Sequence, residues 1–280
     1  MDKIGAIVQA RLSSTRLPQK ILKTLPFAGT TTVLEQVIRR LKKSKRLEDI
    51  IIATTIEDED NEIVKIAKKE NVRWFTGDRE NVLERHYLSA KENKVNVIVR
   101  ITSDCPCVDP EIVDLAISEH LESKSDYTTN TFNRTFPHGL DVEVVNFDVL
   151  EKAHLGAKYD YEKEHVTPYI FKTNPHLFKI GNIDAPKDLY APEIRVTLDT
   201  EEDYTLLCTI FDYLYPENEY FSAKELVDLF KQKPWLKLIN KKVLQKKIFN
   251  TLNEEVKEAI RILDLQGLKK AKQLFREHRK

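Results

Sequence analysis

Residues 4–20, IGAIVQARLSSTRLPQK, join a short apolar segment directly to a loop of cationic and hydroxyl side chains. The segment from Ile4 to Val8 predicts a buried strand, because a short apolar run closed by polar residues is typical of a strand covered on both faces. The loop that follows carries three cations and three hydroxyls within ten residues: Arg11, Arg16, Lys20, Ser13, Ser14 and Thr15. It starts at the carboxyl end of the predicted strand, which is where open α/β sheets bind their ligands.

Similar apolar segments recur through the first half of the chain and alternate with helical patterns. Further strands are predicted at residues 50–55, 72–75 and 95–101. A helix is predicted from Thr32 to Lys43, with Thr32 and Glu35 as its capping box, and another begins at Asp109–Pro110. Because apolar strands that alternate with helices form a mainly parallel sheet, we predict a doubly wound α/β fold.

The regular alternation ends near residue 126. Residues 141–145 and 176–183 resemble strands outside it, so the region 126–185 is expected to hold a mixed-sheet edge or a dimerisation arm. Residues 194–198 predict another core strand, followed by a helix that Thr200 and Asp203 cap. We expect a main domain over 1–221 and, from a capping box at Ser222, a helical, lysine-rich extension over 222–280 packed on it.

The composition excludes several classes of protein. Apolar residues make up 41% and charged residues 32%, as in an ordinary globular chain of 280 residues. Lys plus Arg and Asp plus Glu both number 45, and this balance argues against a generic nucleic-acid binder. The first apolar segment is too short for a signal peptide or membrane insertion. Three cysteines without zinc-type spacing indicate a reducing compartment, so a cytoplasmic location is expected.

The loop after the first strand is a candidate phosphate site. Its backbone N–H groups can face phosphate oxygens, and Arg and Lys can add charge-assisted hydrogen bonds. It lacks the glycines of a Walker loop or of a dinucleotide fingerprint, so neither motif applies. Spacing alone leaves open that this is only a solvated basic loop.

Two aspartates follow predicted strands. Asp104 lies just after the most apolar strand, in ITSDCP, and Asp199 ends the segment RVTLD. Mg²⁺ commonly binds one or two carboxylates plus substrate phosphates, so the pair and the basic loop together indicate a nucleotide–metal site. Either aspartate by itself is more typical of a turn residue that accepts from its own backbone.

Four more residues are candidates from their patterns. Asp141 and Glu143 alternate along a predicted strand, next to His138, and are expected to share one face. They could form a metal pair, a substrate-binding pair or only a solvent face. His165 follows Glu164, and a lone histidine beside a carboxylate is more often structural than catalytic.

These motifs resemble known families. AIVQARLSSTRLPQKIL resembles the N-terminal signature of the sugar-acid cytidylyltransferases, such as the CMP-KDO and CMP-sialate synthetases. GLDVEVVNFDVLEKA, EHVTPYIFKTNP and RVTLDTEEDY resemble the spore coat polysaccharide biosynthesis protein F family. The likeness keeps order and spacing from residue 4 to about residue 250, so it covers most of the chain.

The resemblance implies a GT-A-like nucleotidyltransferase fold that uses CTP and Mg²⁺, often as a homodimer. Carried over by position, Lys20, Arg11, Arg16 and Asp104 are the implied catalytic residues. Asp104 and Asp199 are the implied metal ligands. The implied nucleotide-binding residues are Ala10, Arg11, Ser13, Ser14, Thr15, Lys20, Gly77, Arg85 and Arg100. His138, Asp141, Glu143 and His165 are placed on the acceptor side, within the region 126–185.

Two positions depart from the family pattern. Many relatives have glycine where this chain has Gln19, which affects the path of the loop. Sialate synthetases have an aspartate at the position of Thr197, so the metal site here rests on Asp104 and Asp199 alone or recruits Asp141.

The expected function is Mg²⁺-dependent transfer of CMP from CTP to an acidic, sugar-like acceptor, with release of pyrophosphate, in surface polysaccharide biosynthesis. CTP and that acceptor are the expected partners. One alternative is a GT-A glycosyltransferase with a nucleotide-sugar donor, whose metal-binding Asp-x-Asp would correspond to Asp141-Val142-Glu143. The other is a non-catalytic family member that binds a nucleotide and serves in regulation or assembly.

Overall fold

The computed structural model of the chain describes residues 2–243 and 251–277. It divides the chain into two compact units, Met1–Val243 and Leu244–Lys280. The larger unit carries every predicted site residue.

A seven-stranded sheet forms the centre of the larger unit, with the strand order β3-β2-β1-β4-β6-β5-β7. The strands are β1 (Ile4–Gln9), β2 (Asp49–Thr55), β3 (Arg73–Gly77), β4 (Val97–Thr102), β5 (Tyr127–Thr129), β6 (Glu143–Asn146) and β7 (Ile180–Asn182). The first four strands are parallel, β6 is antiparallel to both β4 and β5, and β7 is parallel to β5. The predicted doubly wound, mainly parallel sheet is confirmed, and the region 126–185 supplies its mixed edge.

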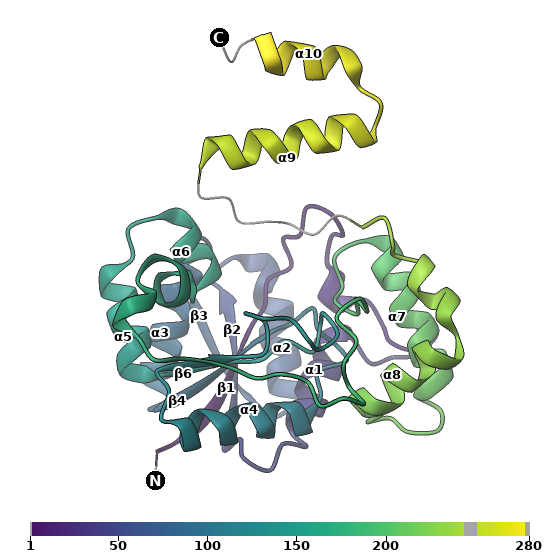
Figure 1. Cartoon of the computed structure of the whole chain (residues 1–280). Helices are drawn as coiled ribbons and strands as arrows, with labels where there is room; N and C mark the ends of the chain where they lie inside the picture. The colour runs from purple at the N-terminus through teal and green to yellow at the C-terminus, as the bar shows by residue number, and fades with distance from the viewer. Residues whose placement is uncertain (1, 244–250, 278–280) are drawn as a thin grey trace. The chain divides into compact units, whose positions relative to one another are not determined.

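Helices connect the strands and cover both faces. They are α1 (Val33–Leu41), α2 (Asn61–Lys69), α3 (Val82–Glu92), α4 (Pro110–Ser123), α5 (Phe147–Gly156), α6 (Asp160–His165), α7 (Glu201–Leu214) and α8 (Ala223–Gln232). Short turns of other helix types lie at η1 (Lys20–Leu22), η2 (Asp58–Asp60), η3 (Tyr169–Thr173), η4 (Pro175–Leu177) and η5 (Pro234–Leu238). Figure 1 shows α3, α5 and α6 together on one side of the sheet and α7 with α8 on the other.

Alternate residues of each central strand enter two different cores. Ala6 and Val8 of β1 pack in the core that includes α1, α2, α4, α7 and α8. Ile7 packs in the second core, with α3 and α5. Since successive side chains of a strand point to opposite faces, a continuous apolar strand can supply both cores.

The predicted helix starts are present. Thr32 Oγ1 accepts from the backbone N of Glu35 (3.2 Å), and the Glu35 carboxylate accepts in return from Thr32 N (2.6 Å), which completes the capping box of α1. Asp109 accepts from the first turn of α4 (2.7 Å to Glu111 N), with Pro110 at its start. Thr200 caps α7, because its hydroxyl accepts from Asp203 N (3.3 Å).

The prediction of a core strand at residues 194–198 was wrong. These residues are extended but lie outside the sheet, and their ladder contact is a single bridge between His138 and Arg195. Their backbone pairs with loops instead: Val196 N donates to His138 O (2.7 Å) and Leu198 N donates to Asp104 O (2.8 Å). The segment is apolar because Ile194, Val196 and Leu198 are buried in the core.

Two other strand boundaries move. β6 begins at Glu143, so Asp141 lies in the preceding loop rather than in the predicted strand. Of the segment 176–183, residues 180–182 form β7, while the turn η4 takes the start of that segment. Pro175 explains this start, because proline fits the first position of a helical turn.

The larger unit extends to Val243, beyond the predicted boundary at residue 221. The predicted capping box of α8 is present, since Ser222 Oγ accepts from Glu225 N (3.2 Å). Leu226 and Phe230 of α8 and Leu236 of η5 are buried in the main core. Residues 222–243 therefore complete the first unit instead of beginning an extension, because their apolar side chains belong to the same core.

The smaller unit contains two helices, α9 (Leu252–Leu265) and α10 (Lys269–Glu277). Lys272 forms an ion pair with Asp264 (2.5 Å), which joins α10 to the end of α9. None of the α9 side chains is buried. Among the described residues, no helix has both the length and the apolarity that a membrane crossing requires.

Candidate active site

The sheet brings the predicted loops together at one edge. β1 and β4 are parallel neighbours, with Gln9 opposite Thr102, so the loops after these two strands leave the sheet side by side. Lys20 stands at the end of the first loop, and Asp104 follows β4 by two residues. Asp199 joins them because the segment before it pairs with the Asp104 loop through the bond from Leu198 N to Asp104 O.

The ammonium group of Lys20 lies between the two aspartates. Its Nζ is 2.6 Å from Asp104 Oδ2 and 2.9 Å from Asp199 Oδ1. Arg16 Nη2 also lies 2.9 Å from Asp199 Oδ1. Two of the three predicted triphosphate cations, Lys20 and Arg16, thus form one cluster with Asp104 and Asp199, whereas Arg11 lies outside it. The side chains of Lys20, Asp104 and Asp199 are 14%, 22% and 21% exposed.

The charges of this cluster stabilise one another. Burial opposes the charge of Lys20, but Asp104 and Asp199 outweigh burial and raise the pKa of the ammonium group. Burial likewise opposes ionisation of Asp199, yet Lys20, Arg195 and Arg16 lower its pKa to about 2. Both groups are therefore charged at neutral pH, and two carboxylates that share one cation suit a divalent ion with phosphate co-ligands. Such an ion would be held by Asp104 and Asp199.

The loop before Lys20 is held by buried leucines. Leu12 and Leu17 are each 4% exposed, whereas Thr15 and Arg16 are exposed. Leu12 N donates to the buried carboxylate of Asp60 (2.8 Å), a residue that no sequence motif indicates. Gln19 has φ 52° and lies in the left-handed region, a conformation that favours glycine. This conformation gives a physical reason for glycine at that position in related chains.

Arg85 and Gly77 lie beside the other end of the same loop. Arg85 of α3 donates to Asp78 O (2.8 Å). It also packs against Gly77, because a Cβ added to that glycine would lie 3.3 Å from the Arg85 side chain. Burial and the nearby positive charge of Arg11 lower the pKa of Arg85 to about 10. Gly77, Arg85 and Arg11 are thus neighbours, as a shared nucleotide site requires.

Arg100 belongs to a different cluster, centred on Glu143. The Glu143 carboxylate accepts from Arg100, from Tyr127 Oη (2.8 Å) and from Thr167 Oγ1 (2.6 Å). Arg100 also donates to Gln9 Oε1 (2.9 Å) at the end of β1. Glu143 therefore links β4, β5 and β6 to the segment that contains Thr167.

Asp141 and Glu143 do not act as a pair. Asp141 accepts two hydrogen bonds from Arg134 (2.6 and 3.0 Å) and one from Gly139 N (3.2 Å), while Glu143 contacts the separate set above. The shared face expected from alternation fails because Asp141 precedes the strand. Among residues 2–243 and 251–277, no group of three or more metal-ligating side chains is assembled.

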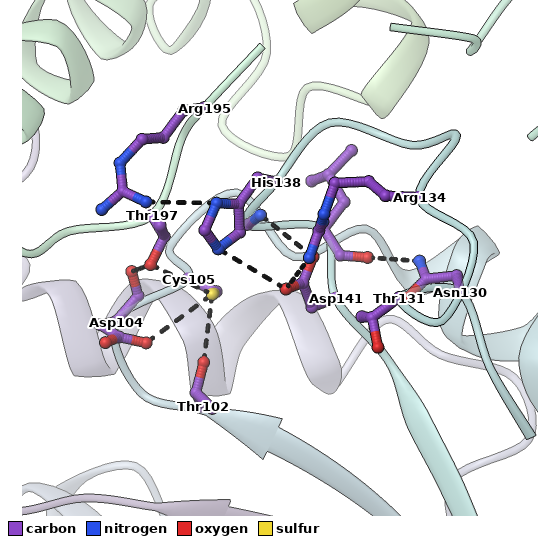
Figure 2. A network of polar contacts seen from close by, with 12 residues as sticks. Thr102, Asp104, Cys105, Asn130, Thr131, Arg134, His138, Asp141, Arg195 and Thr197 are labelled. Carbon is purple, nitrogen blue, oxygen red and sulfur yellow. Dashed lines mark hydrogen bonds and ion pairs between the residues drawn. The ribbon is translucent and has the colours of Figure 1, made fainter. Parts of the chain in front are cut away.

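His138 lies between Asp141 and Arg195 (Figure 2). Arg195 Nη1 and His138 Nδ1 are 3.2 Å apart, and His138 Nε2 is 3.8 Å from Asp141 Oδ2. Burial lowers the pKa of His138. Arg134 and Arg195 were not predicted as site residues, although Arg195 opens the motif RVTLDTEEDY and stands four positions before Asp199.

Thr197 and Cys105 surround Asp104. Thr197 Oγ1 donates to Asp104 O (3.4 Å), so the residue that replaces an aspartate here contacts the loop backbone. Cys105 Sγ lies 3.7 Å from Asp104 Oδ1, and Figure 2 shows the thiol between Thr102, Thr197 and Asp104. Burial raises the pKa of the Cys105 thiol well above its usual value. The thiol is therefore a neutral packing group beside Asp104.

His165 ends α6, and its neighbours connect it to the Glu143 cluster. The next residue, Val166, is buried and has φ 72°. Thr167 follows and donates to Glu143. A β-branched residue with positive φ is strained, and such strain is retained where the surrounding contacts hold it.

The chain is similar to known proteins over most of its length. Residues 5–248 match the cytidylyltransferase family. The chain is 40% identical over 247 residues to an uncharacterised protein of Methanocaldococcus jannaschii, covering 87% of this chain and 97% of that protein. It is 35% identical over 239 residues to the spore coat polysaccharide biosynthesis protein SpsF of Bacillus subtilis, covering 84% and 96%.

Two solved structures are similar as well. A cytidylyltransferase from Leptospira borgpetersenii superposes with a TM-score of 0.79 at 34% identity, over 88% of this chain and all of that one. A CMP-2-keto-3-deoxy-manno-octonic acid synthetase in complex with CTP superposes with a TM-score of 0.55 at 13% identity, over 77% and 99%. The second likeness concerns the fold.

Proposed function

The chain belongs to the cytidylyltransferase family, and from that premise we propose that it transfers CMP from CTP to an acidic, sugar-like acceptor with release of pyrophosphate. The observation that carries the proposal is the cluster of Lys20 with Asp104 and Asp199 at the carboxyl edge of the sheet. This cluster combines the cations that a triphosphate requires with a carboxylate pair that suits Mg²⁺.

The proposed reaction is an in-line displacement at the α-phosphorus of CTP. An acceptor oxygen forms the new P–O bond, the bond to the pyrophosphate oxygen breaks, and the acceptor hydroxyl proton passes to solvent or a nearby base. Mg²⁺ would supply charge neutralisation on the phosphate oxygens. Lys20 and Arg16 stabilise the negative charge that builds on pyrophosphate, because a fixed cation needs no reorganisation during the reaction.

The acceptor side favours an acidic ligand. Arg134 and Arg195 lie on either side of His138, and the side chain of Arg134 is 23% exposed. Arg134 already binds Asp141 through two hydrogen bonds, so the carboxylate of a sugar acid would contact the donors of this guanidinium group that Asp141 leaves. The similarity to a spore coat polysaccharide protein supports a role in surface polysaccharide synthesis. A homodimer and a cytoplasmic location, expected from the sequence, stay predictions.

The test is pyrophosphate release from CTP, UTP, ATP and GTP with Mg²⁺, against a panel of sugar acids. Release with CTP and one acceptor, abolished by a chelator, would identify the substrate. Asp104→Asn should lower turnover by about 10–100-fold at limiting Mg²⁺. The variant should still unfold cooperatively with a modest loss of stability, since Lys20 loses one carboxylate partner but keeps Asp199. An active Asp104→Asn enzyme with an unchanged Mg²⁺ requirement would exclude this metal site, and CTP binding without turnover would favour a non-catalytic role.

A further inference from the structure

Arg195 contacts both sides of the candidate site. Its Nη2 donates to Asp199 Oδ2 (2.8 Å), and its Nη1 donates to His138 Nδ1 (3.2 Å). Asp199 belongs to the Lys20 cluster, and His138 belongs to the acceptor side. One planar guanidinium group therefore joins the two sides directly.

The guanidinium is itself anchored on Asp203. Arg195 Nε and Nη2 donate to Asp203 Oδ1 and Oδ2, both at 3.0 Å. Each carboxylate oxygen also accepts a second bond, from Asn240 Nδ2 (2.8 Å) and from Asp199 N (3.0 Å) respectively. The side chain of Asp203 is 0% exposed. It cannot reach a ligand, so any effect it has on the reaction passes through Arg195 and Asp199.

The contact with Arg195 also decides the tautomer of His138. A guanidinium group has no acceptor, so Nδ1 of the imidazole must accept and the ring proton must lie on Nε2. Nε2 faces Asp141, which Arg134 holds by two bonds. The hydrogen bond from Arg195 therefore orients the ring, and the Nε2–H points toward Asp141, whose Oδ2 lies 3.8 Å away.

We propose that Arg195, anchored by the buried carboxylate of Asp203, is a positioning residue that aligns the nucleotide side of the site with the acceptor side. This inference rests on the proposed function and adds a residue pair to it. The alignment matters because a displacement of the reacting groups by about 1 Å can cost about 10²-fold in rate. Outer contacts that orient active-site ligands typically affect activity by about 10–100-fold.

The kinetic test compares three variants. Asp203→Asn keeps the shape of the anchor but removes its charge, and Arg195→Lys keeps the positive charge but cannot reach all three partners. Both should lower kcat by about 10–100-fold and leave the KM for CTP within about threefold, since Lys20 and Arg16 remain. Glu202→Gln is the control, because Glu202 is exposed in the same turn of α7 and loses the same charge. It should keep kcat within about twofold.

A second measurement needs no turnover. The nitrogen NMR resonances of the His138 ring, assigned with the His138→Gln variant, should show Nδ1 as the unprotonated nitrogen in the wild-type protein. They should shift in both Asp203→Asn and Arg195→Lys and stay in place in Glu202→Gln. If Asp203→Asn does not unfold cooperatively, the kinetic and the NMR comparisons are both made with Arg195→Lys.

Wild-type kcat in the folded variants, or an unchanged His138 spectrum in them, overturns the positioning role. A wild-type protein that releases no pyrophosphate contradicts the proposed function instead. The NMR comparison is made without substrate, so it separates the two failures.

Discussion

At the scale of single residues, the charge of Lys20 is the centre of the site. Its two carboxylate partners come from distant parts of the sequence, and each alone resembles an ordinary turn aspartate. Their contact with one ammonium group distinguishes them from turn residues. Arg16 adds a second cation to Asp199, so the cluster has charge of both signs at the carboxyl edge of the sheet.

Replacing Lys20 with alanine should reduce kcat/KM for CTP by about 10²–10³-fold, because the pyrophosphate charge loses its fixed cation. The measurement is the initial rate of pyrophosphate release. Lys23→Ala serves as the control, since Lys23 lies in the same segment and contacts the Tyr204 ring instead of an aspartate. Equal rates for wild type and Lys20→Ala would exclude this role.

His86 predicts a pH dependence of stability. Its ring is buried, Nδ1 lies 2.9 Å from Val82 O, and burial together with the charge of Arg100 lowers its pKa from 6.5 to about 3. Between these values the unfolded chain binds more protons than the folded chain, so the free energy of unfolding falls as the pH falls. The stability that the protein gains from a neutral His86 is fully present above the unfolded pKa of 6.5. It is lost as the pH falls toward the folded pKa of about 3.

From about pH 6.5 to about pH 4.5 this loss amounts to roughly 2–3 kcal/mol. Urea unfolding at several pH values measures it. His86→Leu should flatten the curve in this range, whereas His176→Leu, at an exposed position, should leave it unchanged. Parallel curves for wild type and His86→Leu would contradict the assignment.

At the scale of elements, loops rather than strands determine the arrangement of the site. The segment that carries Arg195 and Asp199 is extended yet pairs with the His138 and Asp104 loops. The loop after β1 turns at Gln19, which has positive φ, and Lys20 follows directly at the start of η1. Both features depend on backbone contacts between loops, which apolar periodicity does not record.

Gln19 allows a test of this turn. Gln19→Gly should be tolerated, with pyrophosphate release within about threefold of wild type, because glycine adopts positive φ without steric cost. Gln19→Val should destabilise the protein by about 1–2 kcal/mol and lower activity, because β-branched side chains disfavour this conformation. Thermal unfolding and initial rates of both variants decide the matter, and a stable, active Gln19→Val protein would show that the turn can rearrange.

At the scale of the whole molecule, the larger unit contains both described cores and every predicted site residue. Among the residues that the structure describes, the side chains of the two cores, including those packed at their margins, lie between Ile4 and Ile239. Asn240 near the end of this unit donates to Asp203, so even its last turn supports the site. The larger unit therefore extends as far as Val243.

A chain that ends at Val243 should therefore fold and retain activity. Its midpoint of thermal unfolding should stay within about 2 °C of that of the full chain, because α9 and α10 contribute no side chain to either core among the described residues. Pyrophosphate release should stay within about threefold. A chain that ends at residue 221 is the contrasting variant and should not fold, since it lacks Leu226, Phe230 and Leu236.

The sequence by itself determined the parallel strands β1 to β4, the helices between them and the family, but not the strands at the mixed edge. Apolar periodicity, capping boxes and loop composition are local, so β1 to β4, the starts of α1 and α4, and the basic loop could be predicted without coordinates. The tertiary structure alone decided which side chains meet. The contacts of Lys20 with two distant aspartates, of Arg195 with His138 and Asp203, and of Glu143 with Thr167 join segments remote in sequence. Such contacts form only when the folded core sets the distances between loops, and no local pattern encodes those distances.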